Sequence, residues 1–353
     1  MLATAVRTVV LMDTFVTIKV VDHDATGPVS AVAAAMDQAF EWFRLVEACC
    51  SRFASESELS RLSGHTGMAV PVSAMLYEAV QFALAVAEES GGAFDPTVGR
   101  EMETRGFNRE YTTGQVVRTV TESPSLVSYR NVHLDPQQRT IRCDRPLTLD
   151  LGAVAKGLAI DMAAQELRAF PGFAIDAGGD LYLGGLSAGG GAWKVGIRHP
   201  RRDGLLASLR VSNMAVCTSG DYERVKGGDS SSDHVAHHIV DPREDARSGA
   251  RADTRLAASV TVVAPTAMLA DALATAAFVL GPADGLQLLE HHGVDGLIVS
   301  PTLERHATRG MFSDYDLGID EGATGEQDGK VLQDAEGPAD RHPGRASRAR
   351  RTG

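Results

Sequence analysis

Ser259–Gly281, SVTVVAPTAMLADALATAAFVLG, is the stretch that decides the fold of this chain. Its opening residues, Ser259–Val263, predict a strand, and Pro265 separates that strand from a helix. Thr266 is a residue type that caps helix N-termini, and Gly281 stands where helix-ending glycines occur. The stretch therefore predicts a strand followed directly by a helix of small and apolar residues.

Two polar residues interrupt this apolar helix. Asp271 and Thr275 are four residues apart, so their side chains project from one face, one turn apart. If they are buried they need partners, and a hard cation such as Mg²⁺ prefers oxygen ligands. Alternatively, Asp271 is solvated near the helix start and Thr275 bonds the preceding turn. On this segment alone, the second interpretation is favoured.

Length and composition are typical of a globular protein. The 353 residues suffice for one large or two ordinary domains. A net charge of −12 argues against a general nucleic-acid binder. We find no apolar run long enough to span a bilayer and no signal-peptide core at the N-terminus. We therefore expect a cytoplasmic protein, although a trimmed exported form would have the same features. The four cysteines lack zinc-binding spacing.

Hydrophobic periodicity organises the N-terminal part of the chain. It predicts a strand pair around Met12-Asp13-Thr14, helices at Val29–Ser51 and Ala74–Glu89, and a polar turn with a short helix at Ser51–Ser63. After the second long helix, Pro96 favours an extended conformation at Asp95, so a loop presents this carboxylate. A structural turn and a binding loop explain this loop about equally well.

The middle of the chain contains a candidate anion site. Val132–Cys143 predicts a hairpin, and Leu147–Leu167 predicts a strand that ends at Asp150, a glycine turn, and a helix containing Lys156. Backbone amides at such a helix start, with Lys156 one turn on, can hold an anion such as phosphate. A solvated first-turn lysine is the alternative. The glycine spacing excludes a P-loop.

Further strands and a histidine cluster follow. We expect a strand–turn–strand unit at Phe173–Gly185, a strand at Trp193–Ile197, and a strand in Ala215–Glu223 that runs into a Thr-Ser-Gly turn. His234, His237 and His238 come after a loop rich in Gly, Ser and Asp. This context disfavours a metal-binding helix, so one catalytic histidine is the better interpretation. We predict one domain of two lobes at 1–310 and a disordered charged tail at 311–353.

Eight motifs, in order, resemble those of the ApbE family, the FAD:protein FMN transferases. The resemblance covers about Val10 to Val299. It rests on Met12-Asp13-Thr14, SRFASESELSRLS, GGAFDPTVG, LDLGAVAKGLAID, GGD, TSGDYER, HIVDPR and SVTVVAPTAMLADALAT. It implies an α+β fold with a duplicated, T-fold-like architecture and FAD bound in a cleft between two lobes.

The resemblance also implies a reaction. An enzyme of this family binds FAD with Mg²⁺, transfers FMN to a Thr or Ser hydroxyl of an acceptor protein, and releases AMP. By their matching positions, Ala153, Asp271 and Thr275 correspond to the metal ligands, and His238 to the general base. The positions that line FAD are matched by Met12, Phe53, Ala93, Phe94, Asp95, Asp150, Lys156 and Val240.

Some positions depart from the family pattern. Phe53 replaces a common Tyr, Arg105 stands where Trp is usual, and a longer segment follows Arg243. The lipoprotein signal of the family is missing. Two alternative functions use the same pocket: an FAD pyrophosphatase, in which water replaces the acceptor hydroxyl, and a non-catalytic flavin-binding protein. His238, Asp271 and Thr275 together argue against the non-catalytic alternative.

Overall fold

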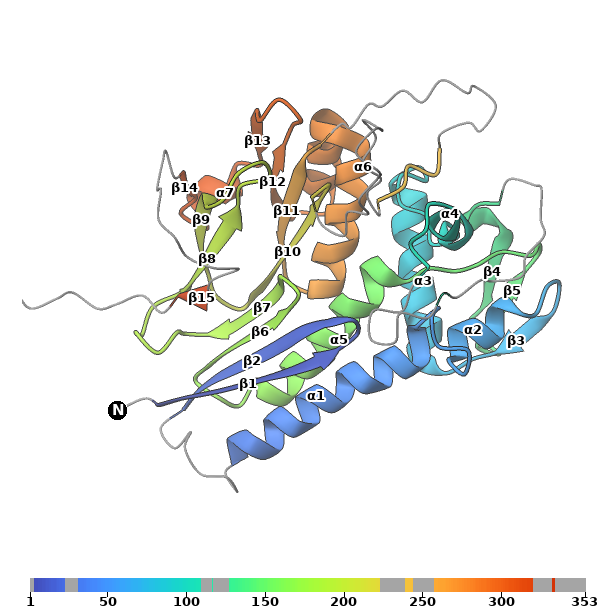
Figure 1. Cartoon of the computed structure of the whole chain (residues 1–353), viewed down its shortest axis with the longest axis horizontal. Coiled ribbons are helices and arrows are strands. Elements are labelled where there is room, and N and C mark those ends of the chain that lie inside the picture. Colours follow the sequence, from blue (N-terminus) through green and yellow to red (C-terminus); the bar gives the residue numbers. More distant parts are fainter. Residues whose placement is uncertain are drawn as a thin grey trace, which may run out of the picture.

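The computed structural model describes residues 3–22, 31–108, 116, 127–222, 239–243, 257–319 and 332–333. Within these residues the chain has the predicted α+β class, built on an antiparallel sheet of eight strands in the order β1-β2-β6-β7-β10-β11-β12-β13 (Figure 1). The strands are β1 (Ala3–Leu11), β2 (Thr14–Asp22), β6 (Gly172–Ala177), β7 (Asp180–Gly185), β10 (Met214–Gly220), β11 (Ser259–Ala264), β12 (Asp295–Val299) and β13 (Arg305–Ala307).

Helices cover one face of this sheet, and further helices lie beside it with a small sheet (Figure 1). The helices are α1 (Ala31–Cys50), α2 (Glu58–Ser63), α3 (Ala74–Glu89), α4 (Gly99–Thr104), α5 (Gly152–Leu167), α6 (Ala267–His291) and α7 (Gly310–Ser313), with a 3₁₀ turn at Tyr129–Asn131. The small sheet has the order β3-β5-β4, formed by Ala69–Pro71, Thr140–Cys143 and Val132–Asp135. Packing of α1, α5 and α6 on the large sheet gives the molecule its main core.

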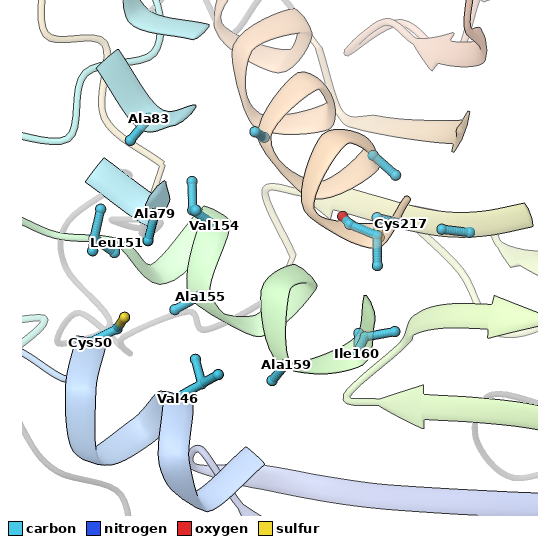
Figure 2. Packing of buried hydrophobic residues seen from close by; sticks show 14 of the residues in the cluster. Val46, Cys50, Ala79, Ala83, Leu151, Val154, Ala155, Ala159, Ile160 and Cys217 are labelled. Atoms are coloured by element: carbon cyan, nitrogen blue, oxygen red, sulfur yellow. The ribbon is translucent and has the colours of Figure 1, made fainter. Parts of the chain in front are cut away.

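Helix α5 lies at the centre of that core. Figure 2 shows its side chains, among them Val154 and Ala155, packed between residues of α1 such as Val46 and residues of α3 such as Ala79. Small residues let the helices come close, and the closest approach is at Gly157. A Cβ atom at this position would lie 2.5 Å from the Cα atom of Met268 in α6. The α5–α6 crossing therefore requires a residue without a side chain.

A second sheet covers the other face of the large sheet. Its order is β14-β9-β8-β15, formed by Gly318–Ile319, Leu205–Val211, Trp193–Arg198 and Leu332–Gln333. Strand alternation separates two cores, because neighbouring residues point to opposite faces. In β11, Val262 packs toward the helices and Val263 toward the second sheet, where Trp193 is fully buried.

The described chain remains folded beyond residue 310, where we predicted that the tail begins. Met311 is fully buried in the second core, and β14 pairs with β9. The apolar character of Met311, Tyr315 and Leu317 explains why this segment packs. Most of the predicted tail, after residue 319, lies outside the described residues.

The strand–helix unit at 259–281 is confirmed. Thr266 caps α6, with its hydroxyl accepting from the Leu269 amide at 3.3 Å. At Gly281 the backbone leaves helical geometry, with φ at 77°, and Pro282 starts a second helical segment. By length and composition α6 could cross a membrane, contrary to our expectation that no segment could. Most of it is buried, as in the core helix of a globular protein.

Two local predictions are wrong. Leu147–Asp150 forms only an isolated bridge, Thr148 with Val98, because no strand of the sheet runs beside it. Thr218-Ser219-Gly220 is not a turn: it completes β10, where it pairs with Ser259–Thr261 of β11. Pairing with a strand distant in sequence made the second segment a strand, and the first segment has no such partner among the described residues.

Candidate functional site

Lys156, Asp180 and Asp271 meet between the sheet and the helices. The Lys156 ammonium is in contact with the Asp180 carboxylate, and its Nζ lies 3.1 Å from Oδ2 of Asp271. Both aspartates are nearly buried, at 5% and 6% exposure. Each comes from a different element: Lys156 from α5, Asp180 from the start of β7 and Asp271 from α6. Two carboxylates and one cation leave this cluster with a net negative charge, which suits a further cation.

The Ser219 hydroxyl of β10 extends the cluster, since it lies 3.2 Å from that of Thr275. The side chain of Thr218, the preceding residue, points to the other face of the sheet, where its hydroxyl lies 2.9 Å from that of Thr261. The Thr218 amide also donates to Asp180 at 3.3 Å. The interpretation of Asp271 as a solvated residue and Thr275 as bonded to its own helix is therefore wrong. Asp271 is paired with Lys156 of α5, and Thr275 is hydrogen-bonded to Ser219 of β10.

The donor set fits a hard divalent cation. Asp271 and Thr275 present a carboxylate and a hydroxyl one helical turn apart, with the Ser219 hydroxyl beside them. Oxygen ligands of this kind suit Mg²⁺ rather than zinc. Among the described residues, no group of three His, Cys, Asp or Glu side chains forms a conventional metal cluster. A hydroxyl and the backbone carbonyl of partly exposed Ala153 would have to complete the ligands.

Lys156 does not stand as a solvated lysine. Its side chain is 19% exposed, and its charge is shared between two carboxylates. In this arrangement the Lys156 ammonium neutralises the two aspartates of the protein rather than a bound anion such as phosphate. Phosphate binding by Lys156 therefore stays a prediction, in which the anion and the carboxylates share one ammonium group.

Asp150 belongs to a second cluster at the N-terminal end of α5. Its Oδ1 accepts from the Gly152 amide at 2.8 Å, and its Oδ2 lies 2.5 Å from Nε of Arg52. The Arg52 guanidinium also lies over the ring of Phe53, 4.2 Å from its centroid. This cluster brings together Phe53 and Asp150, two residues predicted to line FAD that are far apart in the sequence.

The Asp95 carboxylate faces its own loop. Oδ1 accepts from the Thr97 amide at 2.8 Å and the Thr97 hydroxyl at 2.7 Å, and Oδ2 accepts from the Tyr129 amide at 3.0 Å. Burial raises the pKa of Asp95, while these hydrogen bonds act in the opposite direction. The loop Ala93–Thr97 is buried throughout. The Asp95 carboxylate therefore holds the backbone of this loop in place, and contact of Ala93, Phe94 and Asp95 with FAD stays a prediction.

Met12 occupies a two-residue hairpin turn. Met12 and Asp13 have φ values of 50° and 59°, and Leu11 pairs with Thr14 across the turn. Non-glycine residues rarely adopt this conformation. Gly178 lies against it: a Cβ atom there would come 2.4 Å from the Thr14 hydroxyl oxygen. The motif Met12-Asp13-Thr14 and the glycine pair of the GGD motif thus meet in the fold.

His238 lies outside the described residues, and Val240, two positions on, is buried at 8% exposure. Both carboxylate oxygens of Asp241, three positions after His238, bind the Arg243 guanidinium, with 3.0 Å to Nε and 3.0 Å to Nη2. This ion pair raises the pKa of Arg243. Asp241 therefore braces the loop after His238.

Sequence reasoning missed three residues of these clusters: Arg52, Asp180 and Ser219. All three lie within motifs of the family resemblance, but the sequence gives none of them a role of its own. Their partners are distant in sequence, so spacing gives no indication of them. For Arg52, the sequence offers one sign of a role in the site: it is a charged residue directly beside Phe53, which is predicted to line FAD.

The chain matches a known protein family over most of its length. A family model described as the ApbE family matches residues 12–298. This chain belongs to the ApbE family. The matched residues include the hairpin turn at Met12, both clusters on α5, and the strand–helix unit at 259–281.

Several relatives are similar over most of their length. An FAD:protein FMN transferase of Treponema pallidum is 34% identical over 304 residues, spanning 80% of this chain and 82% of the relative. One from Vibrio cholerae is 30% identical over 260 residues, spanning 71% and 75%. The crystal structure of an ApbE protein from Thermotoga maritima superposes with a TM-score of 0.73 at 29% identity, covering 87% of this chain and 97% of that one. The similarity confirms an ApbE-like fold; internal duplication stays a prediction.

Proposed function

We propose that this ApbE-family chain transfers FMN from FAD to a Thr or Ser hydroxyl of an acceptor protein, with Mg²⁺ bound and AMP released. The observation that carries the proposal is the buried cluster of Lys156, Asp271 and Thr275. It lies in a chain that is 34% identical to an FAD:protein FMN transferase. The cluster supplies oxygen ligands for a cation beside an ammonium group, a combination suited to a pyrophosphate.

The proposed reaction is a phosphoryl-type transfer. The acceptor hydroxyl oxygen forms a bond to the phosphorus of the FMN phosphate, and the bond from that phosphorus to the bridging oxygen breaks. AMP leaves with the bridging oxygen, and the hydroxyl proton passes to a base. Atoms and charge balance: FAD and a hydroxyl give an FMN phosphoester and AMP. Positioning and electrostatic stabilisation supply most of the rate enhancement in such transfers.

The chain's own groups have distinct parts in this proposal. Asp271 and Thr275, with the Ala153 carbonyl, would hold Mg²⁺, whose charge would offset that of the pyrophosphate. Lys156, which is already paired with Asp271, would also bind a phosphate oxygen. The backbone carbonyls and amides of Ala93–Asp95, fixed by the Asp95 hydrogen bonds, would orient the nucleotide.

His238 is the proposed general base. An acceptor hydroxyl is a weak nucleophile at neutral pH, so base assistance contributes about 10²–10⁴-fold in rate. His238→Ala should slow transfer by that factor and leave FAD affinity nearly unchanged. His237→Ala is the matched control one position away. Equal losses in the two variants, or a loss chiefly in FAD affinity, would remove His238 from this role.

The test of the function uses FAD, MgCl₂ and a candidate acceptor protein with its target threonine. Intact-mass analysis should show that the acceptor gains one FMN phosphoester, and chromatography should show an equimolar amount of AMP. Free FMN and AMP without a mass gain would indicate an FAD pyrophosphatase. Tight FAD binding with neither product would indicate a flavin-binding protein. Either result contradicts the proposal.

A further inference from the structure

Arg52 is a buried arginine placed between two residues proposed to line FAD. Its side chain is 6% exposed. Nε lies 2.5 Å from Oδ2 of Asp150, and Nη2 lies 2.5 Å from the carbonyl oxygen of Phe107. A buried guanidinium is costly unless its geometry is well satisfied, so these contacts fix its orientation. Arg52 therefore holds the end of α5 against the chain that follows α4.

The guanidinium also covers one face of Phe53. Its Cζ lies 4.2 Å from the ring centroid, within the range of a cation–π contact. A flat ring of a ligand cannot stack on the same face while Arg52 stays there. Phe53 itself is partly exposed, so the ring retains accessible surface. A flat ligand ring that meets Phe53 would do so from the face opposite Arg52.

One nitrogen of the same guanidinium lacks a hydrogen-bond partner among the described residues. Nη1 is buried, and it lies 3.9 Å from Oε1 of Glu103, beyond hydrogen-bond distance. The other two nitrogens are both used. Buried donors without partners are uncommon in folded proteins and call for an explanation. This buried donor makes the placement of Arg52 costly for stability, which indicates a role other than stability.

We propose that Arg52 is a positioning residue of the FAD site. By covering one face of Phe53 and anchoring Asp150, it directs the flat ring of the ligand to the other face of Phe53. The proposal rests on the proposed function, since it assumes that Phe53 and Asp150 line FAD. It assigns the planar, forked shape of arginine a specific task that lysine cannot perform, because lysine is a point charge on a flexible stem.

A double-mutant cycle tests this coupling. FAD affinity is measured by quenching of flavin fluorescence for the wild-type chain, R52K, F53A and the double variant R52K/F53A. We expect R52K to weaken FAD binding about 10-fold in the wild-type background, because a flexible lysine neither covers one face of Phe53 nor fixes Asp150 as the planar guanidinium does. In the F53A background, R52K should weaken it less than about 3-fold, because the residue on which it acts is gone. R44K, at an exposed arginine of α1, is the matched control and should be neutral.

The outcomes separate this proposal from the proposed function. Equal effects of R52K in both backgrounds, or FAD affinity within 2-fold of wild type, would overturn the positioning role while leaving flavin transfer untouched. If the wild-type chain does not bind FAD, the proposed function itself fails. Near-ultraviolet circular dichroism checks that R52K is folded. If it is not, R52Q replaces it in the cycle, because glutamine removes the guanidinium from the face of Phe53 and leaves Asp150 in place.

Discussion

Lys156 of α5 and Asp271 of α6 form an ion pair across the crossing of these two helices, with 3.1 Å between Nζ and Oδ2. The residue next to Lys156, Gly157, lies directly against the backbone of Met268 in α6. A side chain at this position would force the two helices to shift and would disturb the pairing of Lys156 with Asp271. The packing of the core thus sets the geometry of the candidate site.

Gly157→Ala should destabilise the protein. The added Cβ atom would lie 2.5 Å from backbone atoms of Met268, so the helices must shift. Overpacking of this kind costs about 1–3 kcal/mol, which exceeds the gain of about 1 kcal/mol in helix propensity. Thermal unfolding should show a lower Tm. Gly191→Ala is the control, because nothing lies within 4 Å of a Cβ atom there. An unchanged Tm for Gly157→Ala would contradict the close crossing.

Asp271→Ala should nearly abolish transfer at ordinary Mg²⁺ concentrations. A metal ion contributes several kcal/mol of charge stabilisation, so the rate should fall at least ~10²-fold. Thr275→Ala removes a neutral ligand and should have a smaller effect. Glu290→Ala, at an exposed position of the same helix, should be neutral. Full activity of Asp271→Ala in metal-depleted buffer would exclude Asp271 as a metal ligand.

Lys156→Met should make the stability of the protein depend on Mg²⁺. The change leaves Asp180 and Asp271 buried without their shared cation, a loss of about 3 kcal/mol for a broken buried pair. Urea denaturation in EDTA measures this loss. Added Mg²⁺ should then stabilise Lys156→Met more than wild type, since the ion replaces the missing charge. Equal stabilisation of both proteins would show that Mg²⁺ does not bind between these carboxylates.

Much of the fold was predictable because local patterns and the final contacts agree. The strand and capped helix at 259–281 follow from alternation, Thr266 and Gly281, and the structure confirms them. The extent of β10 was not predictable, because Thr218-Ser219-Gly220 has the composition of a turn. Its pairing with β11, distant in sequence, makes it a strand.

The candidate site was predictable only in part, and for the same reason. The spacing of Asp271 and Thr275 showed that they share a face, but no spacing indicates that Lys156 and Ser219 lie against that face. The family resemblance supplied Lys156 by position. It did not supply Arg52, whose contacts with Asp150 and Phe107 exist only in the folded chain.

Asp161 should give the protein a distinctive dependence of stability on pH. This residue of α5 accepts from the amides of Ala267 and Met268 at 2.7 Å and 2.9 Å, so it caps the start of α6. Burial raises its pKa from 3.8 to about 6, even though those hydrogen bonds act in the opposite direction. Between these two values the folded protein binds a proton that the unfolded chain has released. The contribution of Asp161 is therefore fully present below pH 3.8 and is lost as the pH rises through about 6.

Asp161→Asn removes this titration and keeps a carbonyl oxygen that can accept one of the two amides. We expect Asp161→Asn to become more stable relative to wild type as the pH rises from about 4 to about 7, so that its free energy of unfolding minus that of wild type increases. Urea denaturation at a series of pH values measures that difference. Asp316→Asn, at an exposed carboxylate of the surface, is the matched control and should show no such trend. A difference that is constant with pH, or that changes in the opposite direction, would show that the folded protein does not hold the Asp161 proton. In that case the ionised carboxylate would be the species that caps α6.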